Sequence, residues 1–173
     1  MDDILLEAPA VLKTTPLRWV QLTQLVTAPL LQAAPARGEW SALDCLRHLL
    51  EAERTVFPVR VRALLAGQDF AAYDPDRQGA VAAQKAPAEL AAEFAALRTD
   101  SLALIETLTR ADLDRQARHQ ELGPVTLSEL LHEWAGHDLM HTVQAERALM
   151  QPFIDGCGPW RRYFRDHLAT EQP

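Results

Sequence analysis

The chain has 173 residues, of which 48% are hydrophobic and 24% charged, proportions that are ordinary for a globular protein. This length suits one core, so we expect residues 1–173 to form a single domain. The formal net charge is -7 and no basic stripe is present, which argues against binding to nucleic acid.

No apolar run approaches the roughly 18 residues that a membrane span needs. The N-terminus reads MDDILLEAP, which is acidic where a secretion signal carries positive charge. We therefore expect a cytoplasmic protein that does not bind membranes. Its two cysteines, Cys45 and Cys157, are too few for a disulfide framework and should be reduced.

Two helices interrupted by proline are predicted in the first third of the chain. A threonine-proline pair resembling an N-cap and first helical position opens a helix over residues 15–31, which Pro29 should kink or end early. Ser41 has an aspartate three residues later, as in a capping box, and opens a helix over residues 41–66 with a kink at Pro58.

The rest of the chain alternates connections with helices. Residues 67–87 have weak periodicity and predict a connection long enough to be functional. Further helices are predicted over residues 88–108, 127–150 and 160–168, with a second connection over residues 109–125 and no convincing strand. We therefore predict an all-α fold, a four-helix bundle with a short extra C-terminal helix.

Two histidines on the helix predicted over residues 127–150 face the way its apolar residues face. One stripe of a 3.6-residue helix reads Leu130, Trp134, His137, His141, Gln144, Ala148. A buried imidazole without a partner costs about 1–3 kcal/mol, so each ring needs one. A divalent metal would satisfy both, because histidines at i and i+4 can converge on one ion.

A third histidine, His48, lies at the edge of the apolar arc of the helix over residues 41–66. A bundle can bring it against the histidine pair, and three imidazoles with water make an open site of the catalytic type. Alternatively, the pair are core histidines bonded to backbone carbonyls or to Glu53. His132 points away from the stripe and is expected at the surface, while His119 and His167 are assigned no role.

Two carboxylates lie close to this stripe. Glu53, in the apolar arc of its helix, either orients a ligand histidine or acts as general base, or else forms a salt bridge with Arg98 or Arg147. Asp138 either orients a histidine or lies at the surface.

Several other polar or aromatic residues near the histidines also have two possible roles. Gln144 either holds a ligand histidine by a hydrogen bond or binds water or substrate. Cys45 either packs in the core or acts as a fourth ligand, and packing is the commoner role of a small buried cysteine. Trp40 and Trp134 are expected to be core anchors rather than substrate platforms.

Two sequence blocks resemble the DinB/YfiT-like family. The first is a tryptophan-serine helix start followed by CLRHLLEAE, and the second is TLSELLHEWAGHDLMHTVQ, an HxxxH motif followed three residues later by glutamine. The blocks and their spacing cover about residues 17–150. The resemblance implies a four-helix bundle, often dimeric, with a Zn2+ or Ni2+ site whose ligands, carried over by position, are His48, His137 and His141.

The sequence departs from the family pattern just before the last of these histidines. Asp138 and the pair Leu139-Met140 replace a second histidine that some relatives carry. This departure affects the wall of the pocket and leaves the three ligand positions intact.

The function that we expect is that of a metal-dependent hydrolase acting on a small molecule, with Glu53 as the candidate catalytic residue. A three-histidine ion can lower the pKa of bound water toward 7, or equally hold a thiolate. The alternatives are therefore a thiol S-transferase using a small thiol of the bacillithiol or mycothiol type, and a non-catalytic, stress-associated metal-binding bundle. Metal binding should weaken as the pH falls through about 6.

Two further expectations concern surfaces. If the protein is an enzyme, the connection over residues 67–87, with Phe70 and Tyr73, is long enough to cover the site as a lid. A homodimer is expected through the first helix and the aromatic terminal segment, which contains Trp160, Tyr163 and Phe164.

Overall fold

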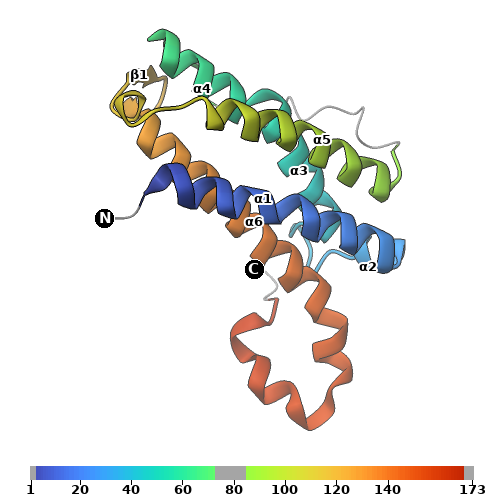
Figure 1. The fold of residues 1–173 in the computed structure, drawn as a ribbon. Coiled ribbons are helices and arrows are strands. Elements are labelled where there is room, and N and C mark those ends of the chain that lie inside the picture. Colours follow the sequence, from blue (N-terminus) through green and yellow to red (C-terminus); the bar gives the residue numbers. More distant parts are fainter. Residues whose placement is uncertain (1–2, 73–84, 170–173) are drawn as a thin grey trace.

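The computed structural model describes residues 3–72 and 85–169 of the chain. Its helices and strands follow one another along the chain as coloured in Figure 1. Within the described residues they are α1 (Ile4–Leu25), α2 (Ala28–Gln32), α3 (Ala42–Thr55), α4 (Phe57–Ala66), α5 (Pro87–Glu106), the 3-10 turn η3 (Arg110–Asp112), β1 (Gln116–His119), β2 (Gly123–Thr126), α6 (Leu127–Gly156) and the 3-10 segment η4 (Gly158–His167).

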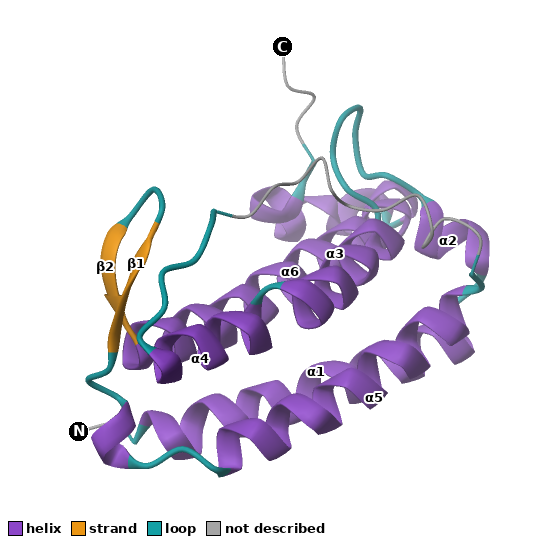
Figure 2. Ribbon diagram, turned by 90° about the horizontal axis from the view of Figure 1, so that it is seen from above, coloured by secondary structure: helices purple, strands orange, loops and turns teal. Residues whose placement is uncertain are grey.

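The four long helices α1, α3, α5 and α6 form the bundle. Helices α1 and α5 lie side by side, α6 packs against α1, α3 packs against α5, and α3 and α6 pack against each other (Figures 1 and 2). The end of α6 and the segment η4 extend beyond the bundle at one end (Figure 1). This arrangement confirms the predicted all-α four-helix bundle with an extra C-terminal helical segment.

The hydrophobic core falls into two clusters, and each of the four long helices contributes to both. One cluster includes Leu12, Phe57, Ile105, Leu130 and Trp134. The other includes Trp19, Leu46, Leu49, Phe94 and Ala145. Between them lie buried polar side chains of the bundle, which include Thr15, His48, Glu53, Arg98, Ser101, Asp138 and His141. The fold therefore encloses a polar layer between two apolar ones.

Two capping boxes fix the helices that carry the candidate site. The Ser41 hydroxyl accepts a hydrogen bond from the backbone N–H of Asp44, and the Asp44 carboxylate accepts one from the backbone N–H of Ser41. Thr126 and Glu129 make the same reciprocal pair at the start of α6. Both predicted helix starts are confirmed, so the histidines are carried on helices with well-defined beginnings.

The predicted start of the first helix at residue 15 is wrong. Helix α1 begins at Ile4 and contains Pro16 in its interior, and it ends at Leu25, with Pro29 in the separate helix α2. An interior proline cannot donate to the carbonyl four residues earlier. Here that carbonyl belongs to Leu12, and the Arg98 guanidinium donates to it from α5 at 2.9 Å. A contact across the bundle therefore replaces the missing hydrogen bond.

Other boundaries differ less. The helix predicted over residues 41–66 is divided at Val56, and Pro58 lies in the first turn of α4. Helix α6 continues through Pro152 to Gly156, six residues beyond the predicted end. Helix α5 and the segment η4 begin and end within two residues of the predicted ranges.

A two-stranded hairpin in the second connection was not predicted. Strands β1 and β2 are antiparallel, with Gln116 opposite Thr126 and His119 opposite Gly123. Gly123 has a φ of 82°, a left-handed conformation that favours glycine at the turn. The strands are four residues long and β1 reads QARH, so neither length nor apolar alternation marks them in the sequence.

In the described part of the chain, no helix combines the length and apolar character that crossing a bilayer requires. Cys45 and Cys157 are both unpaired, as expected. The predicted lid contains two aromatic residues. Of these, Phe70 is joined to the hairpin by backbone hydrogen bonds with Arg118 and Gln120. Tyr73 lies outside the described residues.

Candidate metal centre

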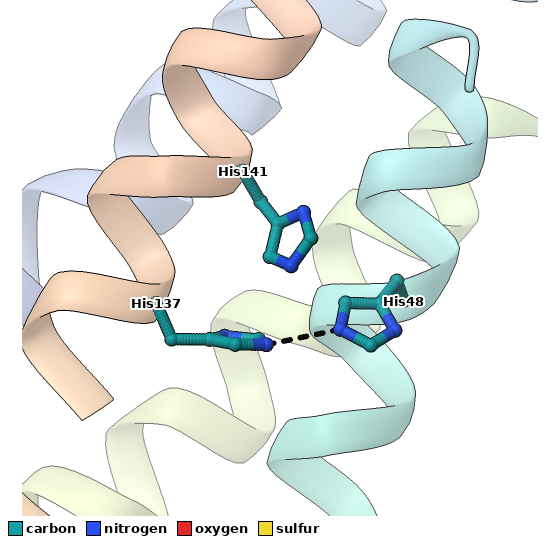
Figure 3. A group of neighbouring side chains, drawn as sticks. All are labelled: His48, His137 and His141. Carbon is teal, nitrogen blue, oxygen red and sulfur yellow. Dashed lines mark hydrogen bonds between the residues drawn. The ribbon is translucent and has the colours of Figure 1, made fainter. Parts of the chain in front are cut away.

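Three histidine rings from two helices point toward one another in the polar layer. His48 projects from α3, and His137 and His141 project from successive turns of α6 (Figure 3). Their ring centroids are 4.4–5.0 Å apart. One ring nitrogen from each lies within 4.8 Å of the others. The structure thus brings together the three histidines that the sequence singled out.

The spacing of these nitrogens suits one divalent ion. The Nε2 atoms of His48 and His137 are 2.9 Å apart. Two nitrogens bound tetrahedrally to one zinc ion at about 2.1 Å would be about 3.4 Å apart, which is wider than the 2.9 Å of this pair and inside the 4.8 Å within which all three ligand atoms lie. Two Nε2 atoms at this separation either share one hydrogen or both turn their lone pairs toward a cation. The donor set therefore fits a divalent metal.

Gln144 fixes the tautomer of the third ring. The Nδ1 atom of His141 lies 2.9 Å from the Gln144 side-chain oxygen, which can only accept, so Nδ1 carries the hydrogen. The Nε2 lone pair of His141 is then free to face the other two rings. Of the two roles considered for Gln144, this contact is a hydrogen bond to the candidate ligand.

Burial keeps the three rings neutral near pH 7. It lowers the pKa of His48 to about 4 and that of His137 to about 3, assisted in each case by the neighbouring histidines. Burial also lowers the pKa of His141, although the Gln144 hydrogen bond and the Asp138 charge act in the opposite direction. Neutral imidazoles are the form that binds metal, so no proton has to be displaced at neutral pH.

Aromatic side chains form the walls around the rings. The half-buried Trp40 ring stacks on His141 at 5.6 Å and lies 5.0 Å from His48. The buried Phe57 ring meets His137 edge-on at 5.1 Å and stacks on Trp134 at 4.9 Å. Trp134 is therefore a core anchor, as expected, whereas Trp40 is part of the site's wall. These walls keep water away from much of the cluster.

Next to the histidines lies a buried ionic cluster of Glu53, Arg98 and Asp138. Arg98 Nε and Nη2 donate to the two Glu53 oxygens at 2.9 and 2.7 Å. Its Nη1 and Nη2 donate to the two Asp138 oxygens at 2.7 and 3.2 Å, and Nη1 also donates to the Leu12 carbonyl. All five N–H groups of Arg98 are thus used, on residues from α1, α3 and α6.

The contacts of this cluster decide between the alternative roles that the sequence left open for Glu53 and Asp138. Glu53 forms the salt bridge with Arg98, while Arg147 bonds Glu39 and the Leu168 carbonyl elsewhere. Asp138 is 1% exposed and so does not lie at the surface. The burial of Arg98 itself was missed. The signal was present, since Arg98 continues the stripe of Leu90 and Phe94 at a spacing of four.

The remaining candidates lie apart from the three rings. Cys45 packs in the apolar core, where burial raises its pKa to about 12 and disfavours a metal-binding thiolate. His132 and His167 are exposed. His119 is buried in the hairpin, where its Nδ1 accepts from the backbone N–H groups of two turn residues at 3.1 and 3.2 Å. Its role is to hold the turn.

Comparison with known proteins places this geometry in a family. YfiT from Bacillus subtilis, described as a probable metal-dependent hydrolase with an unusual four-helix bundle topology, has a similar structure. It shares 20% sequence identity, the TM-score is 0.74, and the match covers 85% of this chain and 86% of that one. A comparison with curated proteins finds no match. Residues 12–145, which include all three histidines, match the DinB superfamily. The chain therefore belongs to the DinB superfamily.

Proposed function

We propose that this protein is a metal-dependent hydrolase that binds one divalent ion, Zn2+ or Ni2+, through His48, His137 and His141. The observation that carries the proposal is the convergence of three neutral imidazoles from two helices, two of them buried and that of His137 half-buried. Membership of the DinB superfamily and the fold shared with a protein described as a probable metal-dependent hydrolase support it.

The number of ligands favours catalysis over a purely structural ion. Structural zinc sites are usually closed by four protein ligands, whereas catalytic ones keep a position for water or substrate. Within the described residues, the only group of metal-binding side chains at this place is the set of three histidines. A bound ion would supply a water of lowered pKa or polarise a carbonyl group.

The surrounding side chains prepare the site for that chemistry. Gln144 holds His141 in the tautomer that presents Nε2, and the Trp40 and Phe57 rings cover parts of the His141 and His137 rings. Both oxygens of Glu53 accept hydrogen bonds from Arg98. We therefore propose that Glu53 acts on the site through Arg98, in place of the general-base role expected for it.

A thiol S-transferase is the second candidate. Three neutral ligands leave the charge of a divalent ion uncompensated in its coordination shell, which favours an anionic fourth ligand. Hydroxide and thiolate both meet that requirement, and a borderline-soft ion accepts sulfur. A small cellular thiol is therefore the alternative substrate.

Substrate screens on the metal-loaded protein separate the two candidates. Untagged protein is loaded with Zn2+ or Ni2+ and assayed with ester, amide and phosphoester substrates, and with small thiols plus an electrophile. We expect hydrolysis that is lost when the metal is chelated. Thiol transfer without hydrolysis would select the second candidate, and metal binding without either activity would leave a binding module.

We also propose that the protein is a cytoplasmic homodimer. The unpaired state of both cysteines supports the compartment. Trp160 and Tyr163 on η4 are 65% and 67% exposed, more aromatic surface than a lone bundle usually leaves in water. Sedimentation should give about twice the 19.3 kDa of one chain at micromolar concentration, and the mass of one chain would refute the dimer.

A further inference from the structure

In the ionic cluster of Glu53, Arg98 and Asp138, every N–H donor and every carboxylate oxygen has a hydrogen-bond partner, but the charges do not cancel. The cluster contains two carboxylates and one guanidinium, a formal charge of -1, on side chains that are 0–1% exposed. The Leu12 carbonyl, which accepts from Arg98 in place of a helical donor, adds the negative end of its dipole at the same point. Burying net charge is costly unless an opposite charge lies near. Among the described residues, Arg98 is the only cation paired with either carboxylate.

The cluster and the three histidines occupy the same layer of the bundle. Glu53 lies five residues after His48 on α3, and Asp138 lies between His137 and His141 on α6. The electrostatic reach is direct, since the Asp138 charge raises the pKa of His141 and the Arg98 charge lowers that of His137. Charges of the cluster therefore reach the rings from both α5 and α6, and the formal charges of its three members sum to -1.

We propose that the Glu53–Arg98–Asp138 cluster is the buried counter-charge of the divalent ion and sets how tightly the three histidines hold it. The proposal rests on the metal site of the proposed function. Three imidazoles bring no charge to an ion of +2, and a net charge of -1 in the same poorly solvated layer offsets part of it. Arg98 holds the two carboxylates in place and limits their charge to a value that the metal-free bundle tolerates.

A simpler role for the cluster is that of a clamp, because its members join all four long helices. The two roles differ in what happens when charge is removed and shape is kept. A clamp that is weakened lowers the stability of the metal-free protein and leaves the affinity of the folded site unchanged. A counter-charge that is removed weakens metal binding by the folded site.

The test compares Asp138→Asn with Glu146→Gln. Both variants remove one negative charge from α6, but Glu146 is 41% exposed and pairs with Arg18 at the surface. The dissociation constant for Zn2+ is measured at pH 7 by competition with a chromophoric chelator, and the melting temperature of the metal-free protein is recorded beside it. We expect Asp138→Asn to bind Zn2+ about 10- to 100-fold more weakly than wild type. Glu146→Gln should bind as wild type does.

Each other outcome has a distinct meaning. If Asp138→Asn and wild type bind Zn2+ equally tightly, the counter-charge role is refuted and the clamp role remains, whatever the melting temperature. If Asp138→Asn does not fold, Glu53→Gln removes the same charge from α3 and decides by the same criterion. Failure of both variants to fold would also overturn the proposal. Wild-type protein that binds no metal would instead refute the proposed function.

Discussion

The two polar sites of the bundle are satisfied in opposite ways. Arg98 uses all five of its N–H donors, and both of its carboxylate partners are bonded through both oxygens, yet the group keeps a net negative charge. The three histidines are neutral, but two of them face each other through Nε2, and the buried Nδ1 of His137 has no partner among the described residues. One divalent cation bound by the Nε2 atoms would occupy the space between the facing lone pairs and would offset the negative charge of the ionic cluster. The incomplete site is therefore the one to which we assign a ligand.

The largest effect is expected at the histidine site itself. Replacing His137 by Ala removes a ligand that contributes one of three nitrogens, so metal binding and any metal-dependent activity should be abolished. The metal content of dialysed protein, measured by plasma mass spectrometry, checks this. His132→Ala, an exposed histidine on the same helix, is the control and should retain the metal. Metal retained by the His137 variant would rule out the three-histidine site.

At the other site, Arg98→Met should destabilise the fold rather than remove a ligand. It leaves two buried carboxylates unpaired, a change that typically costs about 3–5 kcal/mol. Urea unfolding measures the loss of free energy. The matched control is Arg18→Met, which removes an exposed arginine from its surface pair with Glu146 and should cost about 1 kcal/mol or less. Similar losses for the two variants would show that the buried cluster is not a stability element.

Acid should destabilise the metal-free protein through its buried histidines. The pKa of His48 is about 4 in the folded chain and 6.5 ordinarily, so the unfolded state takes up the proton first as pH falls. Stability contributed by the neutral ring is complete above about pH 6.5 and is lost progressively down to about pH 4, by about 3 kcal/mol for this residue. Urea unfolding at pH 7 and pH 5 should show the drop.

The same measurement on His48→Leu provides the contrast, since leucine has no proton to gain and the dependence on pH should flatten. If stability depended on pH as steeply in this variant as in the wild type, the loss of stability in acid could not be assigned to His48. The lowered pKa also revises the expectation for the metal-loaded protein. Protons should compete with the ion nearer pH 4 than pH 6, because the His48 ring of the metal-free protein remains neutral to that point.

A smaller effect is expected at Gln144. Gln144→Leu keeps the size of the side chain but removes the oxygen that fixes the His141 tautomer. Zinc affinity should fall about 10-fold, with little change in the stability of the metal-free protein. Calorimetric titration measures the affinity, and the half-buried Gln151, bonded to the Arg147 carbonyl on the same helix, offers Gln151→Leu as a control. Equal affinities in both variants would remove the role given to Gln144.

The parts of this account that could be predicted from the sequence are those written in local periodicity. The histidine pair follows the 3.6-residue stripe of α6, and His48 follows the arc of α3, so their convergence required only the packing of two amphipathic helices. The capping boxes at Ser41 and Thr126 are local as well. The family resemblance rests on the same residues.

The parts that could not be predicted depend on contacts distant in sequence. Pro16 reads as a helix start because the hydrogen bond that compensates it comes from Arg98, 86 residues from its acceptor Leu12. The sequence offered Arg98 as one of two possible partners of Glu53, but its further bonds to Asp138 and to the Leu12 carbonyl join other helices and leave no local pattern. The hairpin strands are too short and polar to show an alternating pattern.

The most direct test of the central claim is the stoichiometry of metal binding by untagged protein. Metal-free protein, prepared with a chelator and dialysed, is titrated with Zn2+ in a calorimeter. We predict one ion bound per chain, with binding lost in each of the variants His48→Ala, His137→Ala and His141→Ala. Absence of binding by the wild type, or binding that survives any one of the three substitutions unchanged, would contradict the three-histidine metal centre.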